Sequence, residues 1–176
     1  TSIGDMADWI DGLLASLGVA QATLVGHSQG VLVALETASR HPERVAALTL
    51  IAGAMAIPVN DALIEMSQSA PEKAYRMMTS WGHGPGAHKF DNTQPGHAFL
   101  GYGRRVMAQN AGAALHADLV ACDSYDGGKD AAASVTQPSL CLLAGKDKMT
   151  PVKFGRKMAE QISGAQCHVF ARAGHF

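Results

Sequence analysis

Short apolar runs alternate with stretches of helical periodicity along this chain. Between residues 3 and 17 apolar residues recur every three or four positions, which predicts an amphipathic helix that is capped by Ser2 and ends at Gly18. Further helices are predicted at residues 30–40 and 151–162, the latter with Thr150 as its cap. Four short runs predict buried strands, at residues 22–25, 45–52, 139–144 and 166–171.

This order of elements predicts an α/β fold with a mostly parallel sheet flanked by helices. The run at residues 45–52 is almost continuously hydrophobic, which favours a parallel sheet covered on both faces. The strand and helix alternation is interrupted from about residue 55 to 134. That region contains helical patterns at 61–81 and 97–121, separated by a loop at 82–96 that is rich in Gly, Pro and His.

The interruption predicts a helical insertion in a single α/β core. We expect residues 1–54 and 135–176 to form the core, and residues 55–134 to form a cap over it. The cap sequence holds Met and aromatic residues that could pack its helices together, line a substrate pocket, or do both.

Composition and charge narrow the class of partner. Of the 176 residues, 47% are hydrophobic and 16% are charged, and the formal net charge is -1. The sequence has no run of Lys or Arg, which argues against a nucleic-acid partner, and no apolar stretch reaches the about 20 residues of a membrane-spanning helix. A small-molecule substrate is therefore expected. Three cysteines form neither a disulfide framework nor a zinc motif and favour a reducing, cytoplasmic location.

The motif Gly26-His27-Ser28-Gln29-Gly30 follows a predicted strand and precedes a predicted helix. In a G-x-S-x-G turn of this kind the strand turns so sharply into the helix that the serine adopts a strained backbone and presents its hydroxyl above the sheet edge. Both glycines are expected to be required sterically, since a side chain would collide across the turn. Ser28 is thereby predicted to be a nucleophile, which needs a nearby base to take its proton.

Two further polar residues follow predicted strands. Asp147 lies in Gly145-Lys146-Asp147-Lys148-Met149-Thr150-Pro151, after the strand at 139–144, and His175 lies near the end of the chain, after the strand at 166–171. Since carboxyl ends of parallel strands share one edge of a sheet, these residues and Ser28 are expected to meet there. Asp123, Asp126 and Asp130 are weaker candidates for the acid, because they fall in the insertion or its return.

With these motifs in this order, and with the Arg40-His41-Pro42-Glu43-Arg44-Val45 step, the chain resembles the α/β-hydrolase superfamily. The likeness is to the capped branch of carboxylesterases, lactonases and hydrolases of meta-cleavage products. It implies Ser28 as nucleophile, His175 as general base and then acid, and Asp147 as the carboxylate that orients the imidazole. It also implies no metal and no organic cofactor.

The same resemblance implies that the backbone N–H of Gln29 supplies half of an oxyanion hole. The other donor would come from a loop after an earlier strand, and the sequence begins downstream of where that strand is expected. The chain is therefore expected to be a truncated catalytic domain that lacks the N-terminal strands.

Cleavage of a small, mostly apolar carboxylic ester is the leading hypothesis. Carbon–carbon bond hydrolysis of a ring-fission product is the alternative, and paired Arg104 and Arg105 are candidates to bind its carboxylate. A non-catalytic ligand-binding protein or fragment is the third hypothesis. The residues His27, His83, His88 and His97 are given no catalytic or metal-binding role, and the oligomeric state stays open.

Overall fold

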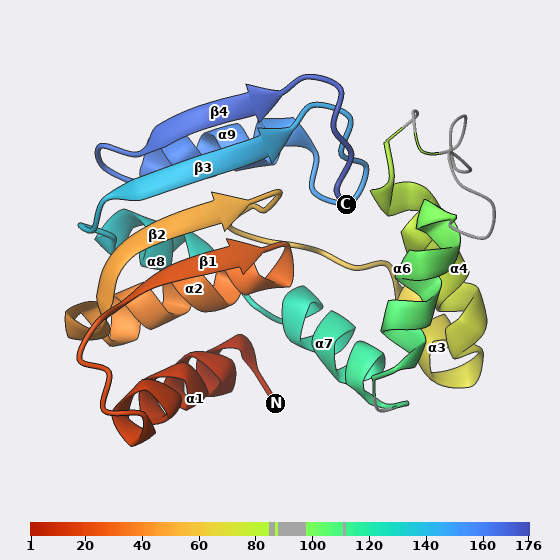
Figure 1. Cartoon of the computed structure of the whole chain (residues 1–176), viewed down its shortest axis with the longest axis horizontal. Coiled ribbons are helices and arrows are strands. Elements are labelled where there is room, and N and C mark those ends of the chain that lie inside the picture. The colour runs from red at the N-terminus through yellow and green to blue at the C-terminus, as the bar shows by residue number, and fades with distance from the viewer. Residues whose placement is uncertain (85–86, 88–97, 111) are drawn as a thin grey trace.

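A computed structural model describes residues 1–84, 87, 98–110 and 112–176. Its strands form one parallel sheet in the order β1-β2-β3-β4, as Figure 1 shows. The strands are β1 (Ala22–His27), β2 (Val45–Ile51), β3 (Ser139–Ala144) and β4 (Gln166–Phe170). The predicted parallel α/β architecture is confirmed, and the strand bounds agree with the sequence patterns to within about two residues.

One face of the sheet carries the main core. Helices α2 (Gln29–Arg40), α8 (Gly128–Ser134) and α9 (Val152–Gln161) pack there. Alternate strand residues point into this core, among them Leu48 and Leu50 of β2, each 1% exposed or less. Helix α1 (Ile3–Ser16) packs on α2, and its predicted cap is confirmed because the Ser2 hydroxyl accepts from the N–H of Asp5.

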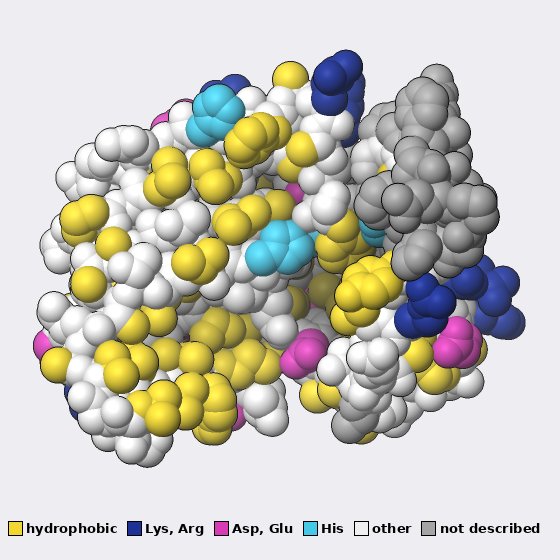
Figure 2. Space-filling model, in the orientation of Figure 1, with side chains coloured by type: hydrophobic (Ala, Val, Ile, Leu, Met, Phe, Trp, Pro, Cys, Tyr) yellow, Lys and Arg dark blue, Asp and Glu magenta, His cyan; other side chains and the backbone are white. Residues whose placement is uncertain are grey.

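The expectation of a sheet covered on both faces is wrong for the described residues. The opposite face of the described sheet exposes apolar side chains, and Val25 of β1 and Phe170 of β4 are 66% and 51% exposed. Figure 2 shows apolar side chains spread over this side of the molecule. A run of small and apolar residues cannot by itself tell which of the two faces a neighbouring layer covers.

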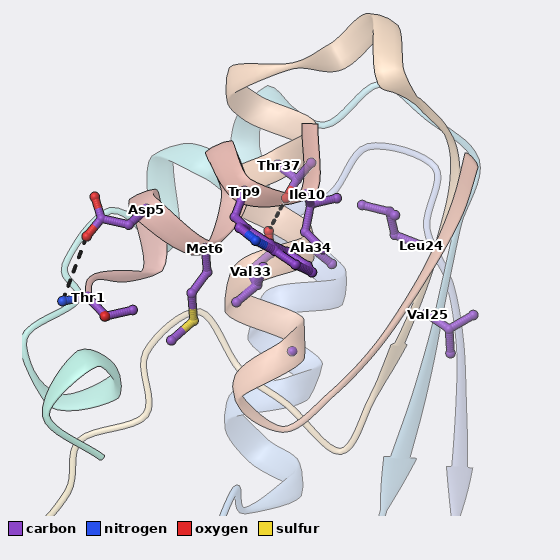
Figure 3. A pocket seen from close by; sticks show the side chains of 11 residues that line it. Thr1, Asp5, Met6, Trp9, Ile10, Leu24, Val25, Val33, Ala34 and Thr37 are labelled. Atoms are coloured by element: carbon purple, nitrogen blue, oxygen red, sulfur yellow. Dashed lines mark hydrogen bonds and ion pairs between the residues drawn. The ribbon is translucent and has the colours of Figure 1, made fainter. Parts of the chain in front are cut away.

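β1 is also an edge strand, and a groove of about 520 Å³ lies between it, α1 and α2. Figure 3 shows Trp9 and Met6 of α1 opposite Val33 and Ala34 of α2, with Leu24 and Val25 of β1 at one side. The groove is largely apolar. Gly30 lines it as well.

The two long helical patterns of the middle region are each divided in the structure. The first gives α3 (Asp61–Ser69) and α4 (Pro71–Gly82), because Pro71 cannot continue a helix and instead starts the next one. The second gives α6 (Phe99–Ala108) and α7 (Ala114–Asp123). The predicted loop at 82–96 lies mostly outside the described residues.

The middle region has a hydrophobic cluster of its own. Leu63, Ala74, Met78 and Leu119 are its buried members, contributed by α3, α4 and α7. Figure 1 shows α3, α4 and α6 standing to one side of the sheet layer. In contrast, α8 places Ala131 and Ala132 in the main core, although its residues fall in the range expected to form the cap. The division at residues 54 and 135 stays a prediction.

Among the described helices, none combines the length and the apolar character that crossing a bilayer requires.

Candidate active site

Ser28 stands between β1 and α2 with φ 55° and ψ -119°, a combination that side-chain-bearing residues rarely adopt. Its N–H donates to the carbonyl of Ile51 on β2 at 3.0 Å, and its carbonyl accepts from Val31 at 2.9 Å. The strained turn expected from the sequence is therefore present. Backbone strain of this kind persists only where surrounding structure holds it, and it is common at functional sites.

The two glycines of the motif differ in their surroundings. A Cβ on Gly26 would collide with the backbone of Gly30 and Val31, so glycine is required at position 26. At Gly30 nothing lies within 4 Å of a Cβ, and the residue borders the open groove beside β1. The predicted steric need for Gly30 is thus wrong for the described residues, because the turn is crowded on only one side.

Gln29 opens α2, where the first N–H groups have no partner within the helix. Among the described residues no acceptor bonds to the N–H of Gln29. The Gln29 side chain donates instead to the backbone carbonyl of Asp118 on α7, at 2.9 Å. A free backbone donor therefore lies beside Ser28, at the positive end of a helix.

Asp147 and His175 meet at the carboxyl ends of β3 and β4. The Nδ1 atom of His175 lies 2.8 Å from Oδ2 of Asp147, and each side chain is 1% exposed. Because an ionised carboxylate only accepts hydrogen bonds, Nδ1 carries the proton and Nε2 is left as the basic nitrogen. Within the described residues no hydrogen bond joins His175 to the Ser28 hydroxyl, as is common for such groups before substrate binds.

Thr150 completes the environment of Asp147. Its N–H and that of Met149 both donate to Oδ1 of the carboxylate, at 2.8 Å. Its hydroxyl lies 2.8 Å from Oδ2 and 2.7 Å from the carbonyl of Ala52, so its single proton can serve one of the two at a time. The predicted helix-capping role of Thr150 is wrong: α9 has Pro151 as its N-cap, and Thr150 turns toward the carboxylate.

Ala52 links β2 to this network. It directly follows β2 with φ 46°, so the chain bends there in the left-handed region that alanine seldom occupies. Its N–H donates to Leu142 of β3 at 2.9 Å. The second strand therefore contributes a main-chain carbonyl to the site, through Thr150.

The loop that carries His175 is fixed at several points. His27 Nε2 lies 2.7 Å from the His175 carbonyl, and the two imidazole rings are in tilted contact with centroids 4.7 Å apart. Phe176 donates its N–H to Gly82 at the end of α4 and packs its ring on His83. His175 is in this way held beside the Ser28 turn on one side and against the helical region on the other.

The electrostatics favour an ionised Asp147. Burial alone would raise its pKa, but hydrogen bonds from His175 and Thr150 and the charge of the imidazole outweigh burial, so the pKa lies below its usual value. The pKa of His27 is lowered, chiefly because its packed ring loses solvent. A negative carboxylate beside His175 stabilises an imidazolium if the ring takes up a proton.

A pocket of about 320 Å³ opens next to Ser28 and Gln29. Its far wall comes from α3, α4 and α7, and Figure 2 shows the surface hollowed between the sheet-bearing part and these helices. Most of the lining is apolar, as in typical small-molecule sites. Its described members include Ile57, Val59, Leu63, Met78, Trp81, Leu115 and Leu119.

The Met and aromatic residues of the insertion divide between the pocket and the helical cluster. Of the Met and aromatic residues in the insertion, Met78 and Trp81 line the pocket, while Met66, Met77 and Met107 pack in the helical cluster. Arg104 and Arg105 lie on α6 and are not among the described residues that line the pocket. The positively charged residue among the described lining residues is Lys148. Sequence reasoning missed Lys148, Asp118 and the carbonyl of Ala52.

The cysteines show no sign of thiolate activation. Burial raises the pKa of Cys122 and that of Cys141 to about 11 each. Cys167 lies on β4, where it pairs with Cys141 of β3, and it is exposed. His83 bonds through Nδ1 to the carbonyl of Thr79, and His88 and His97 lie outside the described residues.

Comparisons with known proteins fit this arrangement. A family profile described as "alpha/beta hydrolase fold" matches residues 1–92, slightly more than half of the chain. The chain belongs to the α/β-hydrolase fold family. The matched segment of this α/β-hydrolase contains Ser28 but ends before Asp147 and His175.

Among curated relatives of this α/β-hydrolase is 2-hydroxymuconate semialdehyde hydrolase of Pseudomonas sp. (strain CF600), 26% identical over 96% of this chain and 61% of that protein. A second is the pimeloyl-[acyl-carrier protein] methyl ester esterase of Neisseria meningitidis serogroup B, 27% identical over 97% of the chain and 68% of that protein. The esterase EaEST from Exiguobacterium antarcticum has a similar fold, with a TM-score of 0.86 at 21% identity over 99% of this chain and 67% of that one. The chain spans about 61–68% of the length of these relatives.

Proposed function

We propose that this protein is a serine hydrolase that cleaves a small, mostly apolar carboxylic ester through an acyl-enzyme intermediate. The observation that carries the proposal is the combination of a strained Ser28 turn with a buried Asp147–His175 hydrogen bond of 2.8 Å at the same edge of the sheet. An ordinary tight turn does not require a serine with a strained backbone, and an ion pair at the surface is not buried. The joint presence of the two features favours nucleophilic catalysis.

In this mechanism His175 takes the proton of the Ser28 hydroxyl through Nε2 while the serine oxygen attacks the ester carbonyl. Asp147 stabilises the imidazolium that forms. The N–H of Gln29 donates to the oxygen on which negative charge develops. His175 then gives its proton to the departing alcohol, and later activates the water that releases the acid and restores Ser28.

The helical segment, for which residues 55–134 are the proposed range, would supply the substrate-binding wall. Its apolar residues Leu63, Met78 and Leu119 lie on the side of the pocket opposite Ser28. An apolar pocket of about 320 Å³ suits a short acyl or alcohol group. Carbon–carbon bond hydrolysis is the second candidate, supported by the likeness to 2-hydroxymuconate semialdehyde hydrolase.

The proposal is tested by reacting the chain with a fluorophosphonate probe and with a series of 4-nitrophenyl esters. Wild-type chain and a Ser69→Ala control, which removes an exposed hydroxyl on α3, are expected to label equally, whereas Ser28→Ala is expected to lose labelling. Labelling that survives Ser28→Ala, or no reaction of the wild-type chain with either reagent, would contradict the proposal. Turnover of a vinylogous ring-fission product in preference to all esters would favour the second candidate.

A further inference from the structure

One face of α7 forms a wall of the pocket beside Ser28. Leu115, Asp118, Leu119 and Cys122 follow the spacing of a single helical face, and all four line the pocket. Three of these side chains are apolar or weakly polar. Asp118 is the single carboxylate among the described lining residues, so it is their one source of negative side-chain charge.

Asp118 is held close to the Ser28 turn. The Gln29 side chain donates to its backbone carbonyl at 2.9 Å, and Gln29 and Ser28 line the same pocket. Asp118 is half-buried, and burial raises its pKa while the Gln29 amide partly offsets this effect. Among the described residues no Lys, Arg or His forms an ion pair with its carboxylate.

The positive charge of the pocket is more exposed. Lys148 lines the pocket from the loop after β3, but its side chain is largely in solvent, where water and salt screen its charge. Asn60 and Thr150 add neutral polar groups. A half-buried carboxylate interacts more strongly with a bound group than an exposed ammonium does, because less solvent separates them.

We propose that Asp118 sets the charge specificity of this pocket: it favours substrates whose bound group carries a cation or a hydrogen-bond donor, and it excludes groups that end in a carboxylate. The inference rests on the proposed hydrolase function and names the substrate class for that site. It also separates the two candidate reactions, since a ring-fission product that carries a carboxylate would place this group against Asp118.

The test is equilibrium binding by calorimetry to the Ser28→Ala chain, which is not expected to cleave its ligand. Three methyl esters with acyl chains of similar length serve as probes: 4-(trimethylammonio)butyrate, its uncharged isostere 5,5-dimethylhexanoate, and monomethyl glutarate. We expect the cationic ester to bind about fivefold or more tightly than its isostere, and the anionic ester to bind most weakly. Adding Asp118→Asn should bring the ratio of cationic to neutral binding close to one.

Glu65→Gln is the matched control, because Glu65 is an exposed carboxylate on neighbouring α3 that does not line the pocket. It should leave the binding ratio unchanged. A ratio that does not respond to Asp118→Asn would overturn the inference, as would an absence of binding by all three esters. Tightest binding of the glutarate ester, lost in Lys148→Gln, would also overturn it and would make Lys148 the anchor.

This experiment fails independently of the proposed function, since binding to the Ser28→Ala chain needs no nucleophile. If the probe labels Ser28 but Asp118→Asn leaves the binding ratio unchanged, the hydrolase proposal stands and the specificity inference falls. If binding follows charge but Ser28 never labels, Asp118 still determines what the pocket accepts and the catalytic proposal falls.

Discussion

The sheet layer and the helices that face it are built differently, although both border the pocket. The sheet layer holds Asp147 and His175 almost completely buried, with both carboxylate oxygens of Asp147 and Nδ1 of His175 bonded to defined partners. The wall formed by α3, α4 and α7 rests on a smaller cluster of Leu, Ala and Met side chains. The contrast indicates that the proposed chemistry depends on a rigid layer, whereas substrate fit depends on a layer that repacks more easily.

Truncating a leucine in each layer tests this contrast most strongly. Leu50→Ala in the main core should cost about 4 kcal/mol, and Leu63→Ala in the helical cluster about 2 kcal/mol, because Leu50 is 0% exposed and lies in the larger core. Denaturant unfolding measures both values.

Tryptophan fluorescence can follow the unfolding of each layer, since the two tryptophans of the chain are Trp9 on α1 and Trp81 on α4. A Trp81→Phe background leaves the fluorescence of Trp9, and a Trp9→Phe background leaves that of Trp81. Leu63→Ala is expected to shift the Trp81 transition more than the Trp9 transition. Equal shifts in both signals would show one cooperative unit and would remove the proposed difference between the layers.

Within the sheet layer, the crowding at the serine turn predicts an asymmetry between two glycines. Gly26→Ala should destabilise the chain by about 3 kcal/mol and reduce probe labelling, because its Cβ would collide with backbone that cannot move aside. Gly30→Ala is the matched control, with open space around its Cβ and a position in α2, and should change stability by less than about 1 kcal/mol. Comparable losses in the two variants would contradict the one-sided crowding.

The Thr150 hydroxyl is expected to contribute a smaller share of rigidity. Thr150→Val keeps the shape of the side chain but removes a donor from the buried carboxylate, which should cost about 2 kcal/mol in unfolding free energy. Thr150→Ser retains the hydroxyl and should lose less than half as much. If both variants lost the same amount, the hydroxyl would contribute no more than the methyl group, which would contradict this prediction.

Acid sensitivity should provide the smallest and most specific signal of the same network. Because the pKa of Asp147 is lower in the folded chain than when unfolded, its contribution to stability is complete above the unfolded value of about 3.9. That contribution is lost as the pH falls through the folded value. Unfolding free energies from pH 6 to pH 3 should therefore fall more steeply for the wild-type chain than for Asp147→Asn, and parallel curves would contradict the assignment.

Sequence reasoning succeeded where local chemistry determines structure. The apolar runs predicted the parallel strands, and the glycine-flanked Ser28 predicted a strained turn that the backbone angles confirm. Asp147 and His175 were placed at neighbouring strand ends by the same logic, and they are hydrogen bonded there. Their catalytic roles stay predictions.

Several of the failed predictions depend on contacts between distant segments. Thr150 has a good capping sequence context, but the carboxylate at Asp147 and the carbonyl at Ala52 compete for its hydroxyl. Asp118 reaches the site only because α7 folds back onto the Gln29 side chain. The pattern of apolar and polar residues along one segment does not indicate which distant segment it will contact in the fold.

The positive-φ residue Ala52 has a consequence for how such a protein can diversify. The long helical segment follows β2, and the residue after this strand contributes only its main-chain carbonyl oxygen to the buried network. Every residue type carries such an oxygen. Replacements farther along the segment can therefore reshape the pocket without altering Ser28, Asp147 or His175. If the proposed function holds, new substrate preferences can arise by exchanging this one segment while the proposed catalytic residues are inherited intact.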